Sequence, residues 1–226
     1  MNNNILTISN VSKVYKIGSQ ELKVLDNISL NVESGEFVSI MGPSGSGKST
    51  LLYTLGTLEQ PTEGKIFLDG QDITKCNDKI ISKIRCQKIG FIYQFYNLMP
   101  DLSVEENILL PVMLDGKKIT QYKEKLKMLL NDVGLYDRRK HKPQELSGGQ
   151  QQRTAIARAL VVNPKLILAD EPIGNLDSQT GTEVMELLRS MNRKYGTTII
   201  QVTHSEESAK YGSRIIYLKD GKIVNG

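Results

Sequence analysis

The chain has 226 residues, of which 39% are hydrophobic and 24% are charged. These fractions are those of an ordinary globular protein and exclude intrinsically disordered, collagen-like and low-complexity chains. At about 150 residues per domain, the length predicts one large domain or two small ones. The formal net charge of +4 is too mild to indicate a nucleic-acid partner.

No segment resembles a transmembrane helix or a signal peptide. A membrane-spanning helix needs about 20 apolar residues, and the longest apolar stretch, near residues 108–114, contains Pro111. The N-terminus has no basic region before an apolar core. Cys76 and Cys86 lack CxxC spacing and suit a reducing compartment. We expect a cytosolic protein, unless a partner holds it at a membrane.

One dense run of basic residues occurs, at Arg138, Arg139, Lys140, His141 and Lys142. It is either a solvated loop or helix end, or a patch that binds phosphate or nucleic acid. Both interpretations stay open at this stage, and we favour the solvated one.

The N-terminal part predicts short strands and one helix. Residues 5–8 and 28–32 alternate between apolar and polar side chains, as half-buried strands do. Residues 36–41 form a short apolar run between two glycines, which indicates a buried strand that ends in a glycine turn. Residues 48–58 then predict a helix, and residues 65–68 predict another strand.

The middle of the chain, from about residue 104 to 162, carries no strand signal. Residues 122–133 show a helical stripe of apolar side chains, and residues 149–161 predict a further helix. We interpret this stretch as a helical insertion. The segment Phe95–Leu114 is unusually apolar for a loop, which internal packing of the helical part would explain.

The C-terminal part returns to alternating strands and helices. Residues 166–169 are continuously apolar, as in a central parallel strand. A helix at about 181–194 and strands at 198–203 and 214–219 follow. This alternation predicts an α/β fold with a mostly parallel sheet.

Residues 42–49 match the phosphate-loop (P-loop) pattern GxxxxGK[ST] in full. Glycines allow consecutive backbone N–H groups to surround a phosphate, and the following helix adds its positive N-terminal end. Lys48 is expected to reach the β- and γ-phosphates, and the Ser49 hydroxyl to bind Mg²⁺. The predicted nucleotide-binding residues are Gly42, Pro43, Ser44, Gly45, Ser46, Gly47, Lys48, Ser49 and Thr50.

Two acids follow the predicted strand at 166–169. Asp170 is expected to hold Mg²⁺, and Glu171 to deprotonate the attacking water, because Pro172 turns the chain there. The alternative is that Glu171 only caps a turn. His204 ends the next strand, at the edge where α/β sheets bind ligands. We therefore predict that it hydrogen-bonds the γ-phosphate, rather than being a purely structural histidine.

The segment Leu146-Ser147-Gly148-Gly149-Gln150 resembles the signature motif of ATP-binding cassette (ABC) ATPases. The order of the P-loop, Gln94, this motif, Asp170-Glu171, residues 175–177 and His204 resembles that family over essentially the whole chain. The resemblance implies a RecA-like, mostly parallel core sheet with an N-terminal antiparallel β part, at residues 1–94 and 163–226. It also implies an inserted helical subdomain at about 95–162, and ATP and Mg²⁺ as ligands.

The resemblance implies further roles for single residues. Tyr15 would stack on adenine, unless it is a tyrosine of the strand core. Gln94 would contact Mg²⁺ and sense the γ-phosphate at the junction with the helical subdomain. Asp177 would contact the opposite subunit.

The signature motif opens a helix, so its N–H groups form a second anion site. One chain cannot easily bring this site to its own P-loop. In the family two chains pair head to tail, so the resemblance implies a homodimer in the ATP-bound state. The residues that act in trans would be Ser147, Gly148, Gly149, Gln150 and Asp177.

Finer features resemble one subgroup of the family. Residues 94–100, 105–107 and 174–178 are similar to those of the ATPases of macrolide exporters, lipoprotein-release complexes and bacitracin-type antimicrobial-peptide exporters. The cell-division ATPase of the same group is also similar. Ile173 departs from the family's usual threonine or serine. This departure bears on subunit contacts rather than on catalysis.

These observations predict the ATP-hydrolysing subunit of an ABC transporter at the inner face of the cell membrane. ATP would close the dimer, Glu171 would activate water, and the motion would pass through Gln94 to a separate permease that contacts about Phe95–Leu114. One alternative is a membrane complex that regulates cell-wall hydrolysis in division. A soluble ABC ATPase of DNA repair or translation would carry a long coiled coil or a second cassette, which this sequence lacks.

Overall fold

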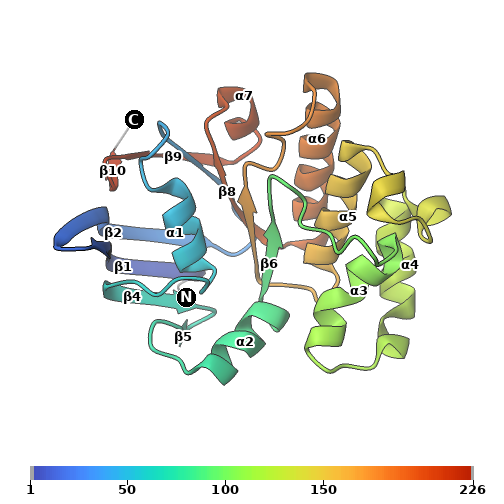
Figure 1. Cartoon of the computed structure of the whole chain (residues 1–226), viewed down its shortest axis with the longest axis horizontal. Helices are drawn as coiled ribbons and strands as arrows, with labels where there is room; N and C mark the ends of the chain where they lie inside the picture. Colours follow the sequence, from blue (N-terminus) through green and yellow to red (C-terminus); the bar gives the residue numbers. More distant parts are fainter. Residues whose placement is uncertain (1–2, 225–226) are drawn as a thin grey trace.

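The computed structural model describes residues 3–224, which form two β-sheets flanked by helices (Figure 1). The four-stranded sheet has the order β2-β1-β4-β5, with β1 (Asn4–Ile17), β2 (Gln20–Glu33), β4 (Glu63–Leu68) and β5 (Gln71–Asp72). The six-stranded sheet has the order β10-β9-β3-β8-β7-β6, with β3 (Phe37–Met41), β6 (Ile89–Ile92), β7 (Leu166–Asp170), β8 (Thr198–Thr203), β9 (Arg214–Lys219) and β10 (Lys222–Val224). The helices are α1 (Lys48–Leu55), α2 (Asp78–Gln87), α3 (Val104–Leu114), α4 (Lys123–Asp132), α5 (Gly148–Leu160), α6 (Ser178–Tyr195) and α7 (Glu206–Ala209).

The six-stranded sheet is parallel except for β10, and the four-stranded sheet is antiparallel. The strands β3, β7 and β8 are almost entirely buried, because both faces of the parallel sheet are covered there. On β7, Leu166 and Leu168 pack in the core that contains α1, whereas Ile167 and Ala169 pack in the core that contains α5 and α6. This arrangement confirms the predicted α/β fold with a mostly parallel core sheet and an N-terminal antiparallel part.

Between β6 and β7, the described chain contains only α3, α4, α5 and short 3-10 turns. Figure 1 shows these helices on the far side of the parallel sheet from β1, β2 and β4. Their apolar side chains share a core with Ile92 and Ile167 of the sheet. The boundaries of the helical subdomain, about 95–162, stay a prediction. No helix among residues 3–224 is long and apolar enough to cross a membrane.

The segment Phe95–Leu114, described as a loop from its sequence, is helical in its second half: α3 begins at Val104, where the predicted helical insertion also begins. Ser103 and Glu106 form a capping box there: the Ser103 hydroxyl accepts from the Glu106 N–H, and the Glu106 carboxylate accepts from the Ser103 N–H at 2.8 Å. This S-x-x-E spacing is a signal for a helix start. Pro111 conceals the helix in the sequence because proline usually ends helices, but it lies inside α3.

Several other elements differ from the predictions. The helix α2 and the short strand β6 were not predicted, although Asn77 caps α2 by accepting from the Ile80 N–H at 3.0 Å. The helix predicted at 48–58 ends at Leu55, and the helix predicted from residue 181 begins at Ser178. The motif-bearing segments are at the predicted positions, so these differences leave the expected site intact.

Candidate active site

The P-loop connects β3 to α1, and Gly47 is one of its constrained positions. Gly47 has a φ of 98°, which L side chains rarely adopt, and a Cβ there would lie 2.7 Å from the carbonyl oxygen of Val24. No side chain caps the N-terminus of α1. Its first backbone N–H groups are therefore available to an anion from outside the helix.

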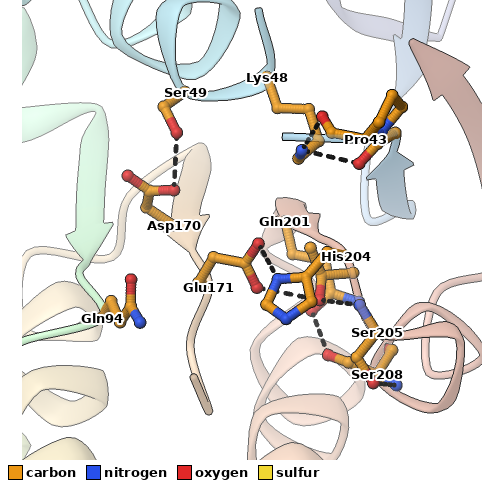
Figure 2. Close-up of polar contacts among 12 residues, drawn as sticks. Pro43, Lys48, Ser49, Gln94, Asp170, Glu171, Gln201, His204, Ser205 and Ser208 are labelled. Carbon is orange, nitrogen blue, oxygen red and sulfur yellow. Dashed lines mark hydrogen bonds and ion pairs between the residues drawn. The ribbon is translucent and has the colours of Figure 1, made fainter. Parts of the chain in front are cut away.

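Lys48 lies across the loop. Its Nζ donates to the carbonyl oxygens of Gly42 at 2.8 Å and Pro43 at 2.9 Å (Figure 2). An ammonium group has three donors, so one remains for a phosphate oxygen. The buried Ser46 Oγ has no hydrogen-bond partner among the described residues. A free ammonium donor beside the backbone N–H groups of a glycine loop fits a polyphosphate.

A cavity of about 350 Å³ lies beside the loop. Its lining residues are Val24, Ser44, Gly45, Gly47, Lys48, Ser49, Thr50, Glu171 and His204. Apart from Val24, all of them were predicted as site residues. Val24 was missed because it lies on β2, far from the P-loop in the sequence, and no local pattern marks it.

Asp170, at the end of β7, lies beside Ser49. Its Oδ1 accepts from the Ser49 hydroxyl at 3.2 Å, and its Oδ2 accepts from the Tyr53 hydroxyl at 2.7 Å. Burial raises the pKa of Tyr53 well above its usual value, and the hydrogen bond to Asp170 raises it further. Tyr53 thus stays a donor that fixes the Asp170 carboxylate. Hydroxyl and carboxylate oxygens are the ligands that Mg²⁺ prefers, so the donor set fits the predicted metal.

Glu171 is held in a left-handed conformation, with a φ of 46°. This sharp turn points its carboxylate away from that of Asp170 and toward His204 (Figure 2). Its Oε1 lies 2.8 Å from His204 Nδ1, and its Oε2 accepts from the Thr203 hydroxyl at 3.2 Å. The side chain is therefore bound to the end of β8 rather than capping its own turn.

A buried polar network joins the segments that precede and follow His204. The Gln201 amide donates to Ser39 Oγ at 2.8 Å and to the Ser208 carbonyl oxygen at 2.8 Å. These bonds tie β8 to β3 and to α7. A single glutamine in an otherwise apolar buried strand is the sequence signal that could have revealed this network.

Several residues predicted for the site do not line the cavity, among them Gln94 and Tyr15. The Gln94 amide donates to Asn175 Oδ1 at 3.2 Å, and Figure 2 shows no bond from it to Asp170. The Tyr15 hydroxyl donates to Glu59. The contacts predicted for these two residues, with Mg²⁺ and with adenine, therefore stay predictions.

The signature motif lies on the other face of the parallel sheet. Ser147 caps α5, and its hydroxyl accepts from the Gln150 N–H at 3.3 Å. The helix α1 packs in the core on one face, and α5 packs in the core on the opposite face. The first turn of α5 therefore cannot reach the P-loop of its own chain, as the predicted action in trans requires. Asp177 caps α6 by accepting from the Thr180 N–H at 3.0 Å.

Comparisons with known proteins agree with this geometry. A family model described as ABC transporter matches residues 25–174. The chain is 47% identical to an uncharacterised ABC transporter ATP-binding protein, MJ0796 of Methanocaldococcus jannaschii, and the match covers 97% of this chain and 95% of that protein. It is 48% identical to the lipoprotein-releasing system ATP-binding protein LolD of Aquifex aeolicus, with 97% and 96% covered.

Solved structures give the same result. The fold is similar to a dimeric, post-hydrolysis state of the MJ0796 cassette bound to ADP and Pi, with a TM-score of 0.87, 45% identity and 97% of each chain covered. It is also similar to cbiO1 of Clostridium perfringens, part of an ABC transporter complex, with a TM-score of 0.88 and 28% identity over 99% of this chain and 88% of that one. The chain therefore belongs to the ABC transporter family, as an ATP-binding subunit that hydrolyses ATP.

Proposed function

We propose that this ATPase powers an export complex of the lipoprotein-release, macrolide or antimicrobial-peptide group. The observation that carries the proposal is the division of the ATP machinery between two faces of one sheet. The P-loop, Asp170 and the Glu171–His204 pair lie together, while the signature helix lies opposite. The relatives named LolD favour lipoprotein release over regulation of cell-wall hydrolysis.

In the proposed mechanism, each group has one task. The P-loop N–H groups and Lys48 bind the phosphates, and Ser49 and Asp170 would hold Mg²⁺, which would neutralise part of the phosphate charge. Glu171 takes a proton from water, whose oxygen bonds to the γ-phosphorus as the bond to the bridging oxygen breaks, leaving ADP and phosphate. His204 holds the Glu171 carboxylate in place through Oε1.

The signature helix completes the site in trans. Its first residues do not line the chain's own cavity, and α5 packs on the opposite face of the sheet from α1, so a second copy must supply these N–H groups. A head-to-tail dimer with two ATP molecules would give each chain a complete ATP site. A relative is dimeric in its solved structures. Ile173 lies beside Gly181 in the first turns of α6, so we expect it to alter the packing of residues 175–177 rather than catalysis.

A groove of about 580 Å³ lies between α2, β6, α3 and α5. Residues that line it include Phe91, Leu110, Pro111 and Leu114, and Leu114 is 71% exposed. The neighbouring Phe95 is 72% exposed. Other parts of the segment Phe95–Leu114, such as Ile108, are buried in the helical core. Internal packing thus explains one side of the segment, and we propose that the other side binds a cytoplasmic helix of a permease.

Replacing Glu171 with glutamine tests the proposed mechanism. Because the amide keeps the shape of the side chain but cannot take the proton, ATP binding should remain while turnover falls by at least about a hundredfold. The variant should also accumulate as an ATP-bound dimer, measured by size-exclusion chromatography with light scattering. Normal turnover in Glu171→Gln would refute the role of Glu171.

Copurification from solubilised membranes tests the groove. Leu114→Asp places a charge on its apolar rim and should abolish recovery of the permease. The matched control is Met128→Asp, since Met128 is also an exposed apolar residue but does not line the groove. A four-span partner with a large external domain would support the export group, and a partner of another architecture would contradict it.

A further inference from the structure

Arg158 is a half-buried cation of α5 that forms no ion pair with any carboxylate among residues 3–224. Its guanidinium instead donates to two consecutive backbone carbonyl oxygens, of Tyr96 at 2.7 Å and Asn97 at 2.5 Å. Loss of water lowers the pKa of Arg158, but a guanidinium remains charged in a protein. Charge-assisted bonds from one planar fork fix the backbone that carries both acceptors.

The two accepting residues have strained backbones. Tyr96 has a φ of 60° and Asn97 a φ of 47°, and both values lie in the left-handed region. Asparagine visits this region readily, but tyrosine does so rarely because its Cβ crowds the following carbonyl. Two such residues in succession persist only where surrounding contacts impose them. The bonds from Arg158 are the charged contacts at this turn.

The turn Phe95–Asn97 connects three places that matter for the reaction. Gln94 precedes it and hydrogen-bonds Asn175. The Tyr96 hydroxyl lies against the signature motif, 2.8 Å from where a Cβ on Gly148 would be. Asn97 and Arg158 themselves line the groove proposed to bind the permease.

We propose that Arg158 is a positioning residue: its two hydrogen bonds hold the turn Phe95–Asn97 in the left-handed conformation that places Gln94 beside Asn175. A segment that enters the groove meets Arg158 and Asn97 directly, so it can move Gln94 through this turn. The inference rests on the role proposed for Gln94 in hydrolysis. It adds a residue that none of the sequence motifs includes.

The experiment uses the absence of tryptophan from the sequence. Phe95→Trp places one fluorophore on the exposed side of the turn, and its anisotropy reports the mobility of the turn. In this background Arg158→Met removes the bonds and keeps an apolar stem, whereas Arg158→Lys keeps the charge and a donor. Ile156→Val is the control for loss of packing. Ile156 is a fully buried, uncharged residue of the same helix.

We expect Arg158→Met to lower the anisotropy and to lower kcat by about tenfold, as disturbing a coupling element does. The KM for ATP should change by less than about twofold, because the P-loop is untouched. Arg158→Lys should recover part of the anisotropy and part of kcat. Ile156→Val should change neither the anisotropy nor kcat. Should Arg158→Met fail to fold, Arg158→Lys alone must show the intermediate mobility and kcat.

An unchanged anisotropy would overturn the inference, as would an equal loss of kcat in Ile156→Val at the same thermal midpoint. A looser turn with a normal kcat would overturn the link from the turn to Gln94. Gln94→Ala distinguishes a failure of this inference from a failure of the proposed function. Low turnover in Gln94→Ala would support the role of Gln94 in hydrolysis, and normal turnover would contradict it.

Discussion

The helices α1 and α5 both begin at a proposed phosphate site, but their N-termini are built differently. The helix α1 follows Gly47 and has no side-chain cap, so its N–H groups depend on a ligand. The helix α5 has its own cap, in which Ser147 and Gln150 exchange side-chain bonds with each other's N–H groups. Residues at the N-terminus of α1 line the cavity of the chain, and those at the N-terminus of α5 do not.

The helix α6 makes the contrast clearer. Its N-terminus is filled by the Asp177 carboxylate, which accepts from the Thr180 N–H at 3.0 Å. A negative charge already stabilises this helix end, so a phosphate would be repelled there. A helix N-terminus is therefore an anion site only where the sequence leaves it uncharged, as at Gly47 and Ser147.

The largest expected effect comes from separating the two sites by mutation. Lys48→Ala removes the phosphate cation, and Ser147→Asp keeps a good N-cap but adds a negative charge. Each variant alone should lose turnover by at least about a hundredfold. Mixed together they should recover about a quarter of the wild-type sites, since half of random dimers are mixed and each carries one intact site. The measurement is ATP hydrolysis against mixing ratio.

The mixing experiment has a clear control. Adding more Lys48→Ala to Lys48→Ala, or more Ser147→Asp to Ser147→Asp, should not raise the activity per molecule. A mixture that stays as inactive as its components would contradict the sharing of sites between chains, and would place the signature motif outside the reaction.

A smaller effect is expected from Ser147→Ala, which removes only the cap of α5. Loss of a serine N-cap costs about 1 kcal/mol of unfolding free energy, measurable by chemical denaturation. Ser147→Asp serves as the control, because it should keep that stability while losing turnover. If Ser147→Ala unfolds like the wild type, the capping box does not stabilise α5.

The smallest effect concerns pH. Hydrogen bonds from the Thr180 side chain and backbone hold the pKa of Asp177 below its usual value. The stabilisation is therefore present above the ordinary carboxyl pKa of about 3.9 and is lost as pH falls through the lowered, folded-state value. Asp177→Asn keeps a good cap without the charge.

We thus expect the difference in thermal midpoint between Asp177→Asn and the wild type to shrink as pH falls below about 4. Unfolding scans at stepped pH check this. A difference that is the same at every pH would show that the charge of Asp177 contributes nothing to the α6 terminus.

The predictions from sequence succeeded where the signal was local. The P-loop, the apolar strand β7 and the strands β8 and β9 were found because glycine spacing and continuous apolar runs are written in consecutive residues. The helix α3 falls within the predicted helical insertion, but its bounds were not predicted; Pro111 lies inside it, and buried packing of Ile108 and Val112 stabilises the helix around this proline. Here tertiary contacts overrode the local preference of proline.

Residues that act across the fold were missed for a different reason. Val24 reaches the cavity from β2, Tyr53 reaches Asp170 from α1, and Arg158 reaches the turn at Tyr96 from α5. Each contact joins residues that are distant in the chain, and the residue that makes it is of a common type. No pattern in one sequence distinguishes such a tyrosine or arginine from its neighbours.

The sequence by itself determined the α/β fold, the phosphate loop, the acids Asp170 and Glu171, and the signature motif, because each depends on residue types at fixed short spacings. The tertiary structure decided that α1 and α5 pack on opposite faces of the sheet, that Glu171 is turned toward His204, and that Gln94 is tied to Asn175. The physical reason is that alternate residues of a strand point to opposite faces. Which helix covers which face is settled only when the whole sheet is assembled.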